Sequence, residues 1–305
     1  GDVLVFLPGE REIKELSNEI KKSRTKSFDI LPLYSRLSVA EQNRVFDARG
    51  KPRIILATNV AETSLTVPRI HYVIDPGLAR ISRYSYKSKI QQLPVEKVSQ
   101  ASAEQRKGRC GRIAPGRCIR LYSQDDFQSR PAFTAPEIMR TNLAAVILQM
   151  LLLRLGNIEK FSFIQSPDQR QISDGFQLLF ELQAVDKERR ITRTGRQMAK
   201  FPVDPRLSRM LIEAAKRDCL TELLIITSAL SLQDPRERPS EHQQKADTTH
   251  KQYWDEKSDF LAFLNLWNTF EKHQKALSQS RLRHYCRSNF LSYARMREWK
   301  DIHYQ

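Results

Sequence analysis

The sequence has 305 residues, 40% of them hydrophobic, which allows two or three globular domains and excludes a disordered chain. Lys and Arg total 51 against 35 Asp and Glu, and the resulting net charge of +16 indicates a polyanionic partner, most simply nucleic acid. A generally basic soluble protein would show the same balance.

The most apolar stretch, LAAVILQMLLLRLG, contains Gln149 and Arg154 and is too short to cross a membrane, so no membrane partner is expected. The four cysteines form no C-x-x-C pair, which favours reduced thiols and a cytoplasmic location. The apolar start, DVLVFLPGE, has no basic leader before it, so we expect the sequence to begin inside an existing domain.

Short apolar runs alternate with helical patterns in the first part of the sequence. The expected strands are VLVFL, DILPLY, RIILAT, IHYVID and GRCIRLY. An amphipathic helix is expected over 10–22, and Ser38 with Glu41 forms a capping-box pattern at the start of another. This alternation favours a parallel sheet covered on both faces. Because ligands bind at the carboxyl ends of such strands, 58–66 is a candidate functional segment.

Residues 78–98, LARISRYSYKSKIQQLPVEKV, alternate partially and predict a protruding β-hairpin. A plain edge hairpin would have the same pattern. The mixture of basic and aromatic residues favours contact with nucleic acid.

From about Phe133 the pattern becomes helical. A long apolar helix over 136–156 closed by Gly156, a second helix over 168–185 and a β-wing over 186–195 predict a winged-helix domain. Further helices are expected after Asp204, with a polar break from Gln233 to Thr249. The last two predicted helices lie around Phe260–Phe270 and from Arg283 to the end. The predicted domains are 1–132, 133–203 and 204–305.

Two elements of a nucleotide hydrolase are missing from this sequence. No glycine opens the phosphate-binding pattern G-x-x-x-x-G-K-[ST]. No acidic pair ends an apolar strand, because Asp255 in WDEKS follows the polar HKQY. We therefore expect no metal site and no ATP hydrolysis by this chain alone.

Three segments in order, LVFLPGEREI, ATNVAETSLT and QRKGRCGR, resemble motifs IV, V and VI of the DEAH-box ATP-dependent RNA helicases of superfamily 2. LPLYSRLS and VIDPGLAR match the segments between these motifs, and ARISRYS is similar to the bacterial HrpA-type group.

The resemblance implies a fold that is α/β plus α, in which a RecA-like parallel-sheet lobe precedes a winged-helix domain and a helical, ratchet-like domain. It also implies a helicase portion whose first RecA-like lobe, with the phosphate-binding loop and the DEAH box, lies outside this sequence.

The family match makes Arg109 and Arg112 arginine fingers, since a guanidinium is always charged and binds phosphate bidentately. Gln105 would orient the attacking water or contact the γ-phosphate. Their spacing of four and three residues predicts one face of a helix. Arg106 falls on another face and is structural or RNA-facing, as Lys107 also could be. A generic basic helix on nucleic acid is the alternative.

In ATNVAETSLT the resemblance assigns Thr58 to the nucleic-acid backbone, and Ser64 and Thr66 to coupling that contact to the nucleotide. Capping of the following helix is an alternative role for these hydroxyls. Phe46 matches an aromatic that stacks on the purine, although a core position is also possible. Pro68 stands where many members of the family have a ribose-binding acid.

The resemblance implies RNA as partner, together with the first lobe, and ATP as cofactor with Mg²⁺ held mainly by that lobe. It identifies no activating protein. The expected RNA-binding residues are Ser35, Arg36, Thr58, Arg80, Arg83, Tyr84, Tyr86 and Lys87. The alternative function is a non-catalytic RNA-binding adaptor that has kept the fold.

Overall fold

The computed structural model describes residues 1–305 except 24–26, 48, 64–65, 86, 113–114 and 240–241. Ser64 and Tyr86, two of the candidate site residues, lie outside the described residues. The chain divides into two compact units, Gly1–Thr141 and Asn142–Gln305.

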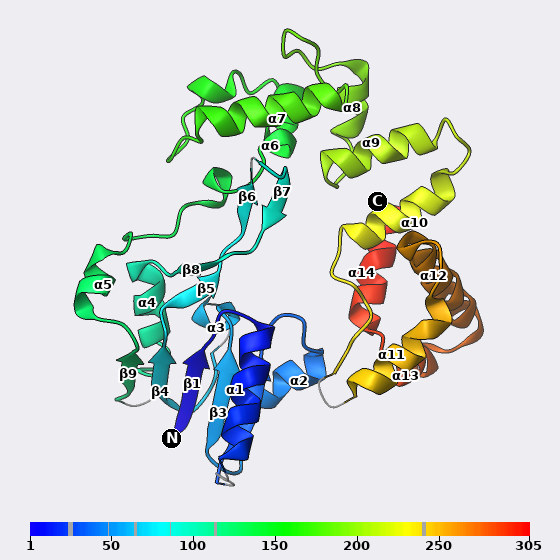
Figure 1. Cartoon of the computed structure of the whole chain (residues 1–305). Coiled ribbons are helices and arrows are strands. Elements are labelled where there is room, and N and C mark those ends of the chain that lie inside the picture. Colours follow the sequence, from blue (N-terminus) through cyan, green and yellow to red (C-terminus); the bar gives the residue numbers. More distant parts are fainter. Residues whose placement is uncertain (24–26, 48, 64–65, 86, 113–114, 240–241) are drawn as a thin grey trace. The chain divides into compact units, whose positions relative to one another are not determined.

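The first unit is built on the predicted parallel sheet (Figure 1). The strand order is β2-β3-β1-β4-β9, and each neighbouring pair is parallel. The strands are β1 (Asp2–Phe6), β2 (Asp29–Leu33), β3 (Arg53–Ala57), β4 (Ile70–Asp75) and β9 (Arg117–Arg120). The fold class expected for this part of the chain is confirmed.

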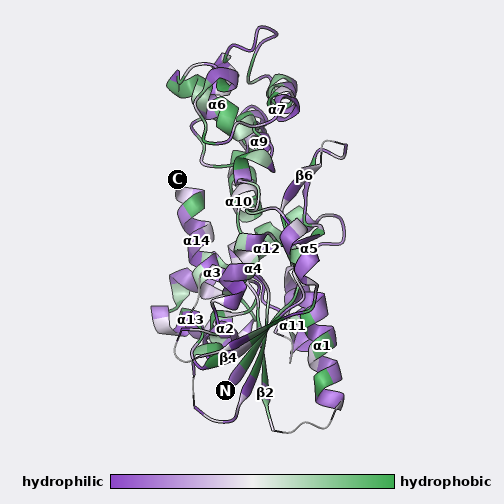
Figure 2. Cartoon of the chain, turned by 90° about the vertical axis from the view of Figure 1, so that its left-hand side faces the viewer, coloured by the Kyte–Doolittle hydropathy of each residue, from purple (hydrophilic) through white to green (hydrophobic). Residues whose placement is uncertain are grey.

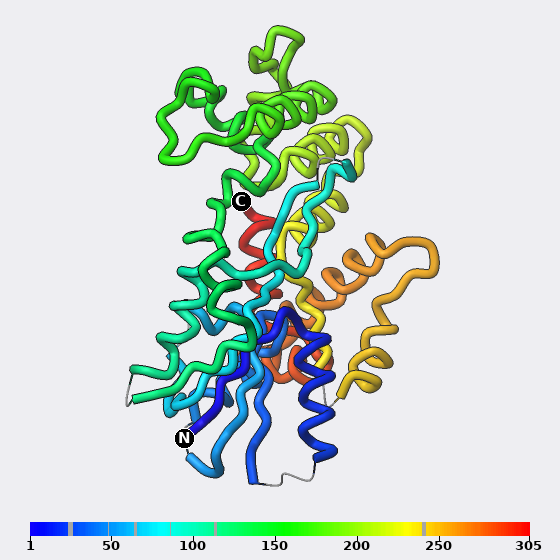
Figure 3. Tube along the Cα trace, turned by 60° about the vertical axis from the view of Figure 1, so that its left-hand side comes forward, coloured from blue at the N-terminus to red at the C-terminus, as the bar shows by residue number. Residues whose placement is uncertain are grey.

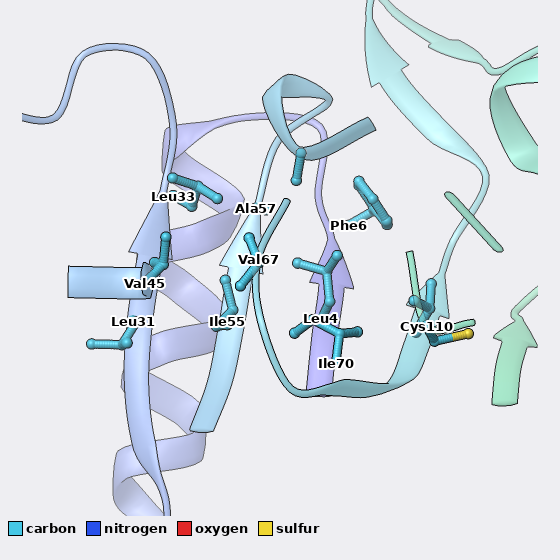
Figure 4. Close-up of a cluster of buried hydrophobic side chains, with 12 residues drawn as sticks. Leu4, Phe6, Leu31, Leu33, Val45, Ile55, Ala57, Val67, Ile70 and Cys110 are labelled. Carbon is cyan, nitrogen blue, oxygen red and sulfur yellow. The ribbon is translucent and has the colours of Figure 1, made fainter. Parts of the chain in front are cut away.

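Alternate residues of each strand face opposite sides of the sheet. On one side Val5 and Leu56 pack against Ile13 of α1 (Glu10–Lys22). This helix is amphipathic and carries both hydrophobic and hydrophilic residues (Figure 2). On the other side Leu4 and Ile55 belong to a second cluster, which Figure 4 shows with α1 behind it.

Two short helical segments follow β2. The predicted capping box is present, with Ser38 and Glu41 at the start of α2 (Val39–Asn43). The 3₁₀ segment η1 (Arg44–Phe46) continues from α2 and inserts Val45 into the second cluster.

The predicted hairpin is present as two antiparallel pairs that extend from the sheet (Figure 3). The strands are β5 (Leu78–Arg80), β6 (Arg83–Ser85), β7 (Ile90–Gln92) and β8 (Val95–Lys97). The other helical segments of this unit are α3 (Val60–Thr63), α4 (Gln100–Lys107), α5 (Gln124–Ser129) and η2 (Glu137–Met139).

The second unit begins with a shorter helix than the sequence predicts. The helix α6 (Ala144–Leu153) starts where the Asn142 side chain accepts a hydrogen bond from the Ala144 N–H at 2.8 Å. It ends at Arg154, which itself takes the left-handed conformation with a φ of 55°, so closure by Gly156 was wrong. Local capping decides both ends.

The remaining winged-helix elements are η3 (Ile158–Lys160), α7 (Gln169–Glu181) and α8 (Arg193–Met198). A Cβ on Gly175 of α7 would lie 2.7 Å from Ile147 Cδ1 and 3.2 Å from the Ala144 backbone nitrogen, so a glycine favours the close packing of α6 and α7. Within the described residues, the predicted wing consists of a single antiparallel bridge between Val185 and Ile191.

Two predictions for the helical region were wrong. The supposed polar break contains α11 (Gln243–His250), and the supposed final helix is interrupted where Phe290 takes a φ of 53°. The elements are α9 (Pro205–Ala214), α10 (Leu220–Leu230), α11, η4 (Lys251–Tyr253), α12 (Asp259–Ala276), α13 (Gln279–Ser288) and α14 (Tyr293–Tyr304). The buried Trp299 Nε1–H donates to Ile225 O at 3.0 Å and so joins α14 to α10.

Candidate functional site

Two strands of the sheet end beside each other at their carboxyl edge. Thr58 follows β3, and its backbone N–H donates to the Leu33 carbonyl at the end of β2 at 3.1 Å. Ser35 and Arg36 follow β2 and are exposed, while Thr58 is partly buried. The parallel pairing therefore brings these three predicted RNA-binding residues to one edge of the sheet.

The helix that carries Gln105 ends before the two arginines. The helix α4 stops at Lys107, and Arg109 N–H donates to Arg106 O at 3.0 Å in a turn. The prediction that Gln105, Arg109 and Arg112 share one helical face was wrong, because the chain leaves the helix at Gly108.

Turn geometry nevertheless brings the Arg109 and Arg112 side chains near Thr66 of the candidate nucleotide segment, whereas Gln105 is exposed. Arg109 Nε donates to the Gln105 carbonyl at 3.3 Å, and Arg112 Nη1 donates to Thr66 Oγ1. Thr66, Arg109 and Arg112 line one small pocket with Leu4 and Ile70. A tertiary contact therefore replaces the helical face as the reason for their proximity.

Arg109 has an unusual environment for a cation. Its Nη1 is buried and has no hydrogen-bond partner among the described residues. Burial lowers the pKa of its guanidinium, and the neighbouring charge of Arg112 acts in the same direction. A buried N–H without an acceptor is costly, and an anion that accepts a hydrogen bond from it would relieve that cost.

Arg106 is the opposite case. Its side chain is fully buried, and its guanidinium lies 2.7 Å from both Glu62 and Asp75. The guanidinium carbon also lies over the Phe6 ring, 4.7 Å from the ring centroid. Of the two roles that the sequence left open for Arg106, the geometry supports the structural one. Sequence reasoning missed Glu62, although its place inside ATNVAETSLT was a usable signal.

Asp75 also organises the turn that follows β4. Its carboxylate accepts hydrogen bonds from the Gly77 N–H at 2.8 Å and the Tyr122 hydroxyl at 2.9 Å. Gly77 has a φ of 73°, a conformation that suits glycine. Burial raises the pKa of the Tyr122 phenol, and the Asp75 charge adds to this effect. The turn leading into the hairpin is therefore held by a buried carboxylate.

Phe46 is 38% exposed, whereas the adjacent Val45 is fully buried. The core position that the sequence allowed for Phe46 is thus taken by its neighbour. Pro68 is partly buried, and its carbonyl accepts a hydrogen bond from Arg53 Nη2 at 3.0 Å.

The hairpin cations are partly neutralised by acids. Arg80 pairs with Glu12 at 3.3 Å, and Arg83 pairs with Glu96 at 2.8 Å. The hydrogen bond to Glu96 raises the pKa of Arg83. Tyr84 is partly buried and Lys87 is exposed.

The described residues hold no group of three or more His, Cys, Asp or Glu side chains that could bind a metal ion. Among the helices of the described ranges, none combines the length and apolar composition that crossing a bilayer requires. The cysteines at 110, 118, 219 and 286, all of them within the described residues, are free thiols.

A parallel-sheet lobe with a basic turn over a small pocket, followed by a helical unit, is the arrangement of a helicase C-terminal region. The family described as helicase conserved C-terminal domain matches residues 1–114. The winged-helix and ratchet-like helicase associated domains (HA2) match 176–203 and 204–283.

Three curated relatives agree with these matches. The chain is 58% identical to the ATP-dependent RNA helicase HrpA of Escherichia coli (strain K12) over 310 residues, and 57% identical to the Haemophilus influenzae homolog of HrpA over 312 residues. Each alignment covers 100% of this chain and 24% of the relative. The probable ATP-dependent RNA helicase DHX35 of Homo sapiens is 36% identical over 304 residues, which cover 96% of this chain and 42% of the relative.

The chain belongs to the DEAH-box RNA helicases and corresponds to the C-terminal part of their helicase core. It spans about a quarter of the length of the two bacterial relatives.

Proposed function

We propose that this chain is the C-terminal portion of an ATP-dependent RNA helicase and supplies the arginine fingers for ATP hydrolysis. Arg109 and Arg112 neutralise charge that develops on the γ-phosphate, and Gln105 orients the attacking water. The observation that carries the proposal is the buried, unpartnered Nη1 of Arg109 beside Arg112 and Thr66. Two converging cations are unfavourable without an anion, and a phosphate provides one.

The same lobe would bind the nucleotide base and part of the phosphates. The exposed ring of Phe46 stacks on the purine, while Ser64 and Thr66 couple RNA contact to the nucleotide. These residues fit ATP, whereas the described residues offer no set of ligands for Mg²⁺. The ion would be held by the first RecA-like lobe, without which the chain is inactive.

RNA would contact the carboxyl edge of the sheet and the hairpin. Ser35, Arg36 and Thr58 suit the sugar-phosphate backbone, because exposed hydroxyls and cations contact it without reading sequence. The hairpin, with Arg80, Arg83, Tyr84, Tyr86 and Lys87, would meet the end of a duplex. Arg80 and Arg83 are each paired with a carboxylate, whereas Lys87 is exposed, which favours Lys87 as the stronger hairpin contact with RNA.

The test is a protein that joins this chain to its first lobe, assayed for RNA-stimulated ATP hydrolysis and for RNA binding. Arg109→Ala is expected to reduce kcat by about 10³-fold or more, as for other arginine fingers, with RNA affinity retained. Arg11→Ala is the control, because this arginine lies on α1 with 82% of its side chain exposed.

The adaptor alternative predicts a different pattern. If the joined protein hydrolyses no ATP, or if Arg109→Ala weakens RNA binding and leaves hydrolysis unchanged, the chain is an RNA-binding module rather than half of a motor.

A further inference from the structure

A buried ion pair joins two neighbouring strands of the parallel sheet in the first unit. Asp2 and Arg53 begin the neighbouring strands β1 and β3, and their side chains are 0% and 2% exposed. Arg53 donates to Asp2 Oδ2 from Nε at 2.8 Å and from Nη2 at 2.6 Å, while the Arg53 backbone N–H donates to Asp2 Oδ1 at 2.9 Å. Asp2 thereby fixes both the backbone and the side chain of Arg53.

The remaining donors of Arg53 reach two segments outside the sheet. Nη1 donates to Val45 O at 3.0 Å and to Asp47 O at 2.6 Å, the two carbonyls that flank Phe46. Nη2 donates to Pro68 O at 3.0 Å, two residues after Thr66. One guanidinium therefore ties the segment that presents the aromatic ring to the segment that contacts Arg112.

Apolar packing also brings the segment around Phe46 and the segment around Pro68 together. Val45 and Val67 enter one hydrophobic cluster with Ile55, as Figure 4 shows. Packing of this kind fixes where the segments lie, but it is non-directional. The hydrogen bonds from Arg53 to the carbonyls on both sides of Phe46 fix the backbone that carries the ring.

A buried ion pair is seldom more stabilising than apolar residues of the same volume, so its role here calls for another explanation. We infer that Arg53 is a positioning residue, which Asp2 fixes in place and which holds Phe46 and the Thr66–Pro68 segment as one rigid edge for the nucleoside. This inference rests on the proposed nucleotide-binding role of Phe46. Since Pro68 has no side-chain group for the ribose, the orientation of Phe46 dominates this lobe's contact with the nucleoside.

The experiment uses the full protein with both lobes and compares the binding of ADP with that of pyrophosphate, which has neither base nor ribose. Arg53→Lys retains the positive charge facing Asp2 but loses the fork that reaches three carbonyls. We expect ADP to bind about tenfold more weakly and pyrophosphate to bind within about twofold of wild type. Arg49→Lys, at an arginine whose side chain is 94% exposed, is the control and is expected to change neither affinity.

A double-mutant comparison separates positioning from general support. Phe46→Ala is expected to weaken ADP binding, and Arg53→Lys with Phe46→Ala is expected to bind ADP no more weakly than Phe46→Ala alone. Additive losses, or equal losses for ADP and pyrophosphate, would overturn the inference. Asp2→Asn, which keeps the side-chain volume, is expected to show the same selective loss of ADP and serves if Arg53→Lys does not fold.

The two proposals can fail separately. If Phe46→Ala weakens ADP binding while neither Arg53→Lys nor Asp2→Asn does, the inference about Arg53 fails and the proposed function stands. If Phe46→Ala leaves ADP binding unchanged, the proposed role of Phe46 fails and the inference fails with it.

Discussion

Neighbouring basic residues in Gln105–Arg112 have opposite environments. The Arg106 guanidinium is surrounded by Glu62, Asp75 and the Leu78 carbonyl, whereas a buried nitrogen of Arg109 has no partner among the described residues. Arginine therefore stabilises the fold at position 106, whereas the arginine three residues later, Arg109, is available to bind a ligand.

Arg106→Met is expected to destabilise the chain by roughly 3–5 kcal/mol, because it leaves the buried Asp75 and the largely buried Glu62 without their cation. Urea unfolding of the wild type and the variant measures this loss. Lys107→Met is the matched control, since Lys107 is 60% exposed and pairs with Glu104 at the surface. A stable Arg106→Met protein with weakened RNA binding would instead make Arg106 an RNA contact.

The elements of the chain follow local signals where those signals are strong. The predicted helix 10–22 matches α1, whose apolar face supplies Ile13 to the core, and the Ser38–Glu41 capping box forms as its pattern indicates. The helix predicted from 136 begins only at Ala144, because η2 occupies Glu137–Met139 and the Asn142 side chain accepts a hydrogen bond from the Ala144 N–H. Periodicity thus identified elements better than it identified their ends.

At the hairpin, Lys87→Glu is expected to weaken RNA binding several-fold and to leave nucleotide binding unchanged. The reason is that Lys87 is exposed, while Arg80 and Arg83 are each paired with a carboxylate. Binding to a partly single-stranded RNA duplex at fixed salt measures the effect. Lys51→Glu, an equal charge change at an exposed position before β3, is the control, and an equal loss there would argue against a specific hairpin contact.

Acid should loosen the helical unit through His250. Burial and the Arg236 charge lower the pKa of this histidine below its ordinary value of 6.5, outweighing the opposing influence of the Phe290 carbonyl and Asp234. As pH falls below 6.5, the unfolded chain takes up a proton before the folded chain does, so this part of the stability is present above 6.5 and is lost below it.

The measurement is the melting temperature of the wild type and of His250→Gln at pH values of about 7.5 and 5.5. Gln can donate to the Phe290 carbonyl that the His250 ring contacts at 3.1 Å, so the variant is expected to lose less stability on acidification. An equal drop in both proteins would show that the pKa of His250 is the same in the folded and the unfolded chain.

The charge of the whole chain gives a prediction that no single residue carries. With a net charge of +16, binding to single-stranded RNA should release counterions, and the logarithm of the affinity should fall linearly with the logarithm of salt concentration. The expected slope is about −0.7 for each phosphate neutralised. Fluorescence anisotropy at several salt concentrations measures the slope, and a flat response would contradict a backbone-binding surface.

The sequence by itself determined the strands of the sheet, the hairpin and the order of the three motif segments, because apolar runs, turn residues and short motifs are local patterns. Gln105, Arg109 and Arg112 were selected because QRKGRCGR resembles a family motif, and the end of α4 at Lys107 contradicts only the supporting argument that they share one helical face.

Only the tertiary structure decided which charges are buried. Arg106 meets Glu62 across 44 positions of the chain, and Arg53 meets Asp2 across 51. The opposite charges at the starts of two neighbouring strands were a usable signal for the second pair, but strand order had to be known first. Burial and ion pairing depend on which distant segments the fold brings together, and local sequence patterns carry little information about that.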